Sequence, residues 1–143
     1  MSTDRSKAPL RILAVDDDEI DRQLIERALG RVDFPTECRF ARDGIEALDL
    51  MRANDGRERP ALVLLDLNMP RLDGHGFLRE LRADEELRRT VVFVLTTSDF
   101  EDDQRLAYDQ GIAGYIVKSS AGRGMCDLVR FLESYWSLVA LPA

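Results

Sequence analysis

The stretch Ala61–Asp66, which reads ALVLLD, places five apolar residues directly before an aspartate. An unbroken apolar run of this length is typical of a strand that is buried on both faces, as in a parallel sheet. Asn68-Met69-Pro70 and then Asp73-Gly74 follow. They predict a sharp turn, because proline fixes φ and glycine permits positive φ. The stretch therefore predicts a central strand that ends at a carboxylate beside a tight turn.

Apolar runs alternate with segments of helical period along the whole chain, five of each. Parallel strands need helical crossovers, so the alternation predicts an α/β fold: a doubly wound five-stranded parallel sheet with five helices in a single domain. The expected strands are Leu10–Val15, Thr36–Ala41, Ala61–Asp66, Val91–Thr96 and Gly114–Val117. The expected helices are Glu19–Val32, Ile45–Ala53, Phe77–Arg82, one opened by a Ser98–Glu101 capping box and ending near Gln110, and Gly124–Ser137.

Composition narrows the class of protein. A chain of 143 residues with 45% apolar residues fits one domain, which we place at 10–137 between a flexible N-terminus (1–9) and an apolar tail (138–143). The net charge of −7 without a basic stripe argues against nucleic-acid binding. The longest apolar runs hold five residues, whereas a membrane span needs about 20. Cys38 and Cys126 form no CxxC pair, so we expect reduced, buried thiols rather than a disulfide, no zinc site and a cytoplasmic location.

Polar side chains follow the expected strands at their carboxyl ends. Asp16-Asp17-Asp18 follows the first strand, Asp66 and Thr96 end two others, and Lys118 follows the last. Ligands of doubly wound sheets bind beyond this edge, so we expect these groups to share one site.

The aspartates at this edge suit a divalent cation, because clustered carboxylates repel one another and magnesium prefers oxygen ligands. The run Asp16–Asp18 also suits a helix N-terminus, and both interpretations stay open, with Asp18 the stronger candidate for a cap. Asp66 could cap the following turn or attack phosphorus to form an acyl phosphate. Thr96 and Lys118 taken singly are an ordinary strand residue and a surface lysine. Together with Asp66 they would surround one phosphoryl group.

His75 is the only histidine, and it follows Asp73-Gly74. One histidine in a turn makes neither a metal site nor a catalytic triad, so we expect a solvated side chain with a structural role.

Four motifs in this order resemble the receiver domains of two-component response regulators, which have a flavodoxin-like fold. They are Val15–Asp18, Leu64–Pro70 with Asp73-Gly74, Val94–Ser98 and Gly114–Lys118, and the resemblance covers about residues 10–136. A finer resemblance is to the small single-domain regulators paired with bacterial and cyanobacterial phytochromes. It rests on Leu95–Ser98, Lys118-Ser119, the Asn54–Pro60 loop and the ending from Tyr135-Trp136 to Pro142. Ser119 stands where most receivers have proline.

The resemblance implies a role for each site residue. Asp16 and Asp17 would hold Mg²⁺, which Mn²⁺ can replace, with Asp66 and the Asn68 backbone carbonyl as further ligands. Asp66 would be the phospho-acceptor, and Thr96 and Lys118 would contact the phosphoryl group. Tyr115 would report activation together with Thr96. The donor would be a sensor histidine kinase, with a bacteriophytochrome as the candidate, and output would go through protein contacts or onward phosphotransfer.

Two other classes of function compete with this interpretation. A small magnesium-dependent phosphatase would use the same nucleophile, but such enzymes usually carry a second aspartate two residues later, where this chain has Asn68. A flavin-binding or purely interacting domain would need no metal, and the aspartates argue against an anionic cofactor at that edge. We therefore expect a signalling protein rather than an enzyme.

The last expected helix is apolar on two sides. Residues at helical spacing form one stripe that suits the core and a second made of Phe131, Tyr135 and Leu138. We expect a homodimer built on Phe131, Tyr135, Leu138, Val139 and Leu141. The alternative is a tail that folds back on its own domain.

Overall fold

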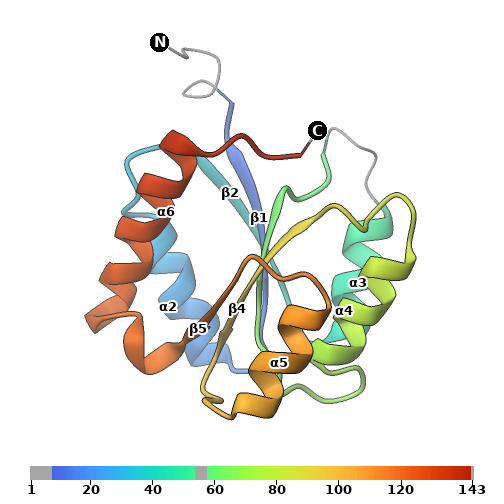
Figure 1. Ribbon diagram of the computed structural model, residues 1–143. Coiled ribbons are helices and arrows are strands. Elements are labelled where there is room, and N and C mark those ends of the chain that lie inside the picture. The colour runs from blue at the N-terminus through green and yellow to red at the C-terminus, as the bar shows by residue number, and fades with distance from the viewer. Residues whose placement is uncertain (1–7, 54–57, 143) are drawn as a thin grey trace.

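The strands form one parallel sheet in the order β2-β1-β3-β4-β5, which confirms the predicted doubly wound fold. The computed structural model describes residues 8–53 and 58–142 (Figure 1). Most of the expected flexible N-terminus and residues 54–57 of the expected loop lie outside these ranges. The strands are β1 (Leu10–Val15), β2 (Thr36–Ala41), β3 (Leu62–Leu65), β4 (Val91–Thr96) and β5 (Gly114–Val117).

Helices cover both faces of this sheet, α2 and α6 on one face and α3, α4 and α5 on the other (Figure 1). Their bounds are α2 Glu19–Leu29, α3 Gly44–Ala53, α4 Gly74–Ala83, α5 Glu101–Asp109 and α6 Cys126–Leu138. Two short 3-10 helices, η1 (Lys118–Ser120) and η2 (Arg123–Met125), lie between β5 and α6. Within the described ranges, none of the helices has the length and apolar character that crossing a membrane requires.

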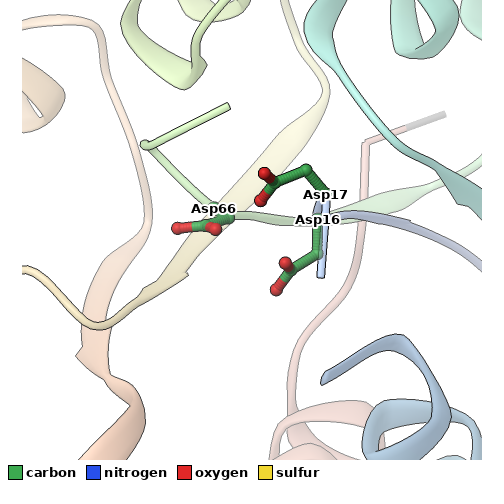
Figure 2. Close-up of side chains that lie close together, drawn as sticks. All are labelled: Asp16, Asp17 and Asp66. Carbon is green, nitrogen blue, oxygen red and sulfur yellow. The ribbon is translucent and has the colours of Figure 1, made fainter. Parts of the chain in front are cut away.

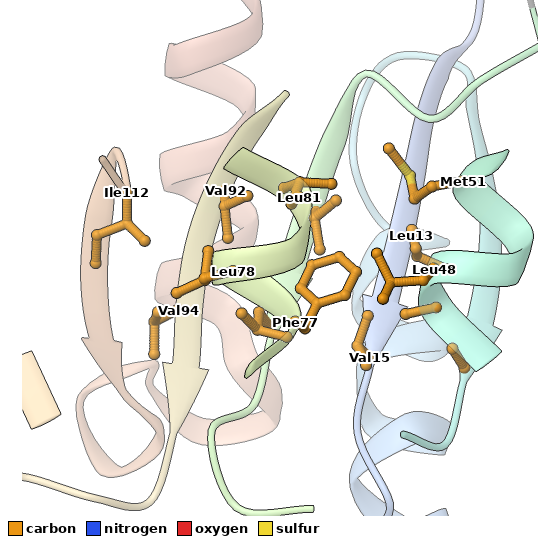
Figure 3. Close-up of a cluster of buried hydrophobic side chains, with 14 of the residues drawn as sticks. Leu13, Val15, Leu48, Met51, Phe77, Leu78, Leu81, Val92, Val94 and Ile112 are labelled. Atoms are coloured by element: carbon orange, nitrogen blue, oxygen red, sulfur yellow. The ribbon is translucent and has the colours of Figure 1, made fainter. Parts of the chain in front are cut away.

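The core lies in two layers because successive side chains of a strand point to opposite faces. In β1, Leu13 and Val15 pack under α3, α4 and α5, whereas Ile12 and Ala14 pack under α2 and α6. Phe77 of α4 is fully buried at the centre of the first layer (Figure 3). Since β3 is buried along its whole length, the carboxylate that follows it is held by a rigid strand.

Helix starts differ most from the predictions. Helix α4 begins at Gly74 rather than Phe77, because the Asp73 carboxylate accepts a hydrogen bond from the backbone N–H of Gly76 at 2.8 Å. The predicted Ser98–Glu101 capping box is wrong: α5 begins at Glu101, Phe100 occupies the N-cap without a side-chain bond, and the Ser98 hydroxyl donates to Asp103 instead. Helix α6 begins later than predicted because Gly124 and Met125 have positive φ.

The C-terminal segment runs back across the amino ends of the strands (Figure 1). Leu141 packs against the core layer of α2 and α6, and Pro142 lies beside Arg59 and Pro60. The described part of the tail therefore folds onto its own domain. Cys38 and Cys126 are free thiols that are partly buried rather than buried as predicted, and burial raises the pKa of Cys38 to about 12.

Candidate functional site

Three aspartates from two neighbouring strands meet at the carboxyl edge of the sheet. β1 pairs with β3 so that Val15 lies beside Leu65, and the next residues along each strand are Asp16 and Asp66. Oxygen atoms of Asp16, Asp17 and Asp66 all lie within 4.8 Å of one another, and Figure 2 shows the three side chains together. Asp16 and Asp66 are buried and Asp17 is exposed, so solvent reaches the cluster at Asp17.

The donor set of this cluster fits a hard divalent cation. Burial raises the pKa of Asp16, although hydrogen bonds from Lys118 and from the Asp18 backbone N–H oppose the shift. A buried carboxylate beside two others is therefore costly to ionise without a cation. Carboxylate oxygens at such close range are the ligands that magnesium and manganese bind. The structure thus brings three of the four predicted ligands, Asp16, Asp17 and Asp66, together in an acidic cluster that suits such a cation.

Asp18 is the cap that the sequence allowed for. Its carboxylate accepts hydrogen bonds from the backbone N–H groups of Ile20 at 2.8 Å and Asp21 at 3.2 Å, and it lies at the N-terminus of α2. The three consecutive aspartates therefore have different roles: Asp16 and Asp17 lie close to Asp66, and Asp18 caps the first turn of α2.

Lys118 joins the cluster from the end of β5. Its Nζ atom lies 2.7 Å from an oxygen of Asp16, 2.6 Å from an oxygen of Asp21 and 3.8 Å from an oxygen of Asp66. Burial alone would lower the pKa of Lys118, but its hydrogen bonds to the two aspartates outweigh burial and raise the pKa. The ammonium group is therefore charged at neutral pH. The peptide bond to Ser119 is trans.

Thr96 reaches Asp66 from β4. Its hydroxyl donates to Oδ1 of Asp66 at 2.7 Å, and the side chain is fully buried. Tyr115 of β5 is linked to this hydroxyl through Ser98. Its own hydroxyl donates to the backbone carbonyl of Ser98 at 2.9 Å, and the Ser98 backbone N–H lies 3.4 Å from the Thr96 oxygen. Asn68 is exposed in the loop after β3, and the role of its carbonyl stays a prediction.

Three contacts near the site were missed by sequence reasoning. Asp21 pairs with Lys118, and the Asp103 carboxylate accepts from Ser98 at 2.6 Å and lies 3.0 Å from Nε2 of His75. The expectation of a solvated His75 is wrong, because its side chain is only 15% exposed and bridges α4 to α5. Helical spacing places Asp21 one turn beyond the Asp18 cap, but no sequence signal pairs it with a lysine 97 positions away.

A profile of the response regulator receiver domain matches residues 12–130. The chain belongs to this family. Response regulator Rcp1 of Synechocystis sp. is 36% identical over 145 aligned residues, which cover 99% of each chain. The probable methanogenesis regulatory protein FilR2 of Methanothrix harundinacea is 38% identical over 130 residues, or 90% of this chain and 84% of FilR2.

Solved structures of phytochrome response regulators share this fold. The phosphorylated cyanobacterial phytochrome response regulator RcpA has a TM-score of 0.85 at 38% identity, covering 95% of this chain and 100% of RcpA. The Mn²⁺-bound form of Rcp1 has a TM-score of 0.82 at 36% identity, covering 94% of this chain and 100% of Rcp1. These findings confirm both the receiver family and the finer resemblance. The chain is a phospho-accepting signalling protein, not a classical enzyme, and the phosphatase and flavin-binding alternatives fall away.

Proposed function

We propose that this receiver accepts a phosphoryl group on Asp66 from the phosphohistidine of a phytochrome-type sensor histidine kinase. The observation that carries the proposal is the pair of groups around the Asp66 carboxylate. Oδ1 accepts the Thr96 hydroxyl at 2.7 Å, and Oδ2 lies 3.8 Å from the Lys118 ammonium. A hydroxyl donor and an ammonium group therefore lie on either side of the Asp66 carboxylate. Both could stabilise the negative charge of a phosphoryl group attached to it.

In this reaction an oxygen of Asp66 forms a bond to phosphorus while the bond from phosphorus to the donor nitrogen breaks, and imidazole leaves. Lys118 offsets charge on the phosphoryl oxygens, and the Thr96 hydroxyl donates to one of them. Asp16, Asp17 and Asp66 would hold Mg²⁺ with the Asn68 carbonyl, and Mn²⁺ can replace it, as the Mn²⁺-bound form of Rcp1 suggests. The bound ion supplies positive charge that lets anionic donor and anionic acceptor approach.

Phosphorylation by acetyl phosphate tests the acceptor. With Mg²⁺ we expect one phosphoryl group per chain by intact mass, none for Asp66→Asn, and normal labelling of the control Asp99→Asn, whose side chain is exposed in the loop after β4. Labelling of the Asp66→Asn protein would refute the assignment. Phosphotransfer from a panel of purified sensor histidine kinases then tests the donor. If other kinases phosphorylate the protein and phytochrome-type kinases do not, the pairing is refuted.

A second proposal is a homodimer through Phe131, Tyr135, Leu138, Val139 and Leu141. Phe131 and Leu138 support it, because they are 38% and 82% exposed on α6, and Phe131 also lines a pocket of about 520 Å³. Tyr135 and Leu141 also pack against their own core, so they would contribute only their remaining surface. Light scattering at micromolar concentration should give twice the chain mass, and half that mass for Leu138→Asp. A monomeric wild-type protein would end the proposal.

A further inference from the structure

We propose that Asp21 holds Lys118 away from Asp66 in the unphosphorylated protein and so slows phosphoryl transfer. This inference rests on the proposed function, because it concerns the same acceptor. It adds a positioning residue that lies outside the carboxylate cluster and acts through the lysine.

The distances around Nζ of Lys118 carry the inference. The atom makes two short contacts, 2.6 Å to Asp21 and 2.7 Å to Asp16, while the oxygen of Asp66 lies beyond hydrogen-bonding range at 3.8 Å. An ammonium group has three N–H donors, and two of them are engaged in charge-assisted bonds. The lysine side chain is only 11% exposed, so water competes little for these contacts.

The fold fixes Asp21 in this position. The Asp18 carboxylate accepts a hydrogen bond from the Asp21 backbone N–H at 3.2 Å, and the Arg22 guanidinium donates to the backbone carbonyl of Asp16 at 2.8 Å. The first turn of α2 is thereby tied to the end of β1. Asp21 cannot follow the lysine toward Asp66 unless this turn opens.

Asp21 differs from Asp16 in its relation to the metal site. Asp16 shares the cluster with Asp17 and Asp66, so a cation there would compete with Lys118 for its oxygens. Asp21 is not a member of that cluster. A cation bound by the cluster would therefore not compete with Lys118 for the Asp21 carboxylate. With Nζ held 3.8 Å from the Asp66 oxygen, Lys118 comes closer to Asp66 only as its contact with Asp21 lengthens.

The initial rate of Asp66 phosphorylation by acetyl phosphate at saturating Mg²⁺ tests this inference. In that step an oxygen of Asp66 bonds to phosphorus, the bond from phosphorus to the acetyl oxygen breaks, and acetate leaves. We expect Asp21→Asn to be faster than wild type by roughly threefold to tenfold, the effect of weakening one partly exposed hydrogen bond between charged groups. Asp21→Ala, which has no acceptor at all, should be at least as fast. Circular dichroism checks that both variants are folded.

The matched control is Glu19→Gln. Glu19 is exposed in the same first turn of α2, and its substitution removes the same unit of charge as Asp21→Asn. We expect its rate to stay within about twofold of wild type, since an exposed charge is screened by salt. In a Lys118→Ala background, Asp21→Asn should have no further effect if Asp21 acts through the lysine.

Three results would overturn the inference: an unchanged or slower rate for Asp21→Asn, an equal acceleration by Glu19→Gln, or acceleration that persists without Lys118. Failure of the proposed function is distinct, because it shows as a wild-type protein that acetyl phosphate does not label. The Asp21 inference falls with it in that case.

Discussion

At the scale of single residues, Thr96 illustrates a side chain that serves the site rather than the core. It is fully buried, yet its hydroxyl is directed to Asp66. Thr96→Val keeps the shape and leaves Oδ1 of Asp66 without this donor. We expect phosphorylation by acetyl phosphate to slow by roughly tenfold to a hundredfold, because hydrogen bonds to charged groups contribute about 1.5–3 kcal/mol.

The exposed neighbour Thr97 provides the control for this change. Thr97→Val should leave the rate near that of wild type, because the backbone and charge of the site stay the same. Equal rates for Thr96→Val and wild type, measured by intact mass over time, would exclude a role for the hydroxyl in transfer.

Gly74 is the second residue whose identity the site requires. A Cβ atom at this position would lie 2.5 Å from the backbone oxygen of Asp66 and 2.7 Å from Cα of Leu67. Both are backbone atoms, so Gly74→Ala must displace the chain that carries the acceptor. We expect lower stability in urea unfolding and slower phosphorylation in the same protein.

Gly30→Ala is the comparison for Gly74→Ala, because its Cβ would meet nothing closer than 3.4 Å and its φ of −67° suits alanine. We expect it to stabilise the protein by about 0.4–1 kcal/mol, since alanine restricts the unfolded chain. Similar behaviour of the two variants would contradict the close approach at Gly74.

The site could be predicted where its residues end strands. Asp16, Asp66, Thr96 and Lys118 follow apolar runs whose carboxyl ends must share one edge, and the structure brings them together. Asp21 and His75 lie on helices, and their partners depend on how the helices pack. Periodicity gives the buried face of a helix but not the polar group that the next element brings to it.

At the scale of elements, Asp43 joins the turn before α3 to the loop after β3. Its Oδ1 accepts the backbone N–H of Glu46 at 2.9 Å, and both of its oxygens accept from the Arg71 guanidinium, at 2.8 and 3.0 Å. Arg71 has a φ of 65°, so the loop that carries Asn68 is held in an unusual conformation. The hydrogen bonds from Arg71 lower the pKa of Asp43.

Asp43→Asn distinguishes these two contacts. Asparagine can still accept the hydrogen bond from the Glu46 backbone N–H, which caps α3, but it loses the ion pair with Arg71. Because the pKa of Asp43 is lower in the folded state, its ionised form stabilises the fold fully at pH values above its unfolded pKa, near 4. This stabilisation is lost as the pH falls through the lowered, folded-state pKa. We therefore expect wild type to be more stable than Asp43→Asn at pH 7, by a gap that closes below about pH 4.

Urea unfolding of both proteins between pH 2.5 and 7 measures this gap. Asp43→Ala, which also loses the cap, should be less stable than Asp43→Asn by about 1 kcal/mol at every pH. A gap between wild type and Asp43→Asn that stays constant with pH would contradict the role of the ion pair.

Element types were predictable, and element starts were not. Four of the strands have the predicted bounds, and for β1, β4 and β5 this is because a mostly apolar run ends at a polar residue. The starts of α4 and α5 depend on which nearby acceptor a cap finds: Asp73 caps α4, while the Ser98 hydroxyl turns to Asp103. A motif of four residues cannot decide between a local acceptor and one on the next turn.

At the scale of the whole molecule, a net charge of −7 and three clustered carboxylates lead us to expect that divalent cations stabilise the fold. A cation that binds only the folded state stabilises it by about 2.7 kcal/mol at a hundredfold excess over Kd. We expect Mg²⁺ to raise the midpoint of thermal unfolding by several degrees relative to chelator. In the Asp17→Asn protein, Mg²⁺ should raise the unfolding midpoint much less.

The clustered carboxylates predict the opposite effect of Asp17→Asn on stability when no metal is bound. Asp17→Asn relieves repulsion within the cluster, so in chelator the variant should be at least as stable as wild type. Asp99→Asn also removes one negative charge but lies outside the cluster, and it should respond to Mg²⁺ as wild type does. An equal rise for Asp17→Asn and wild type would mean that Mg²⁺ acts through general screening. The acidic site would then not be where the cation binds.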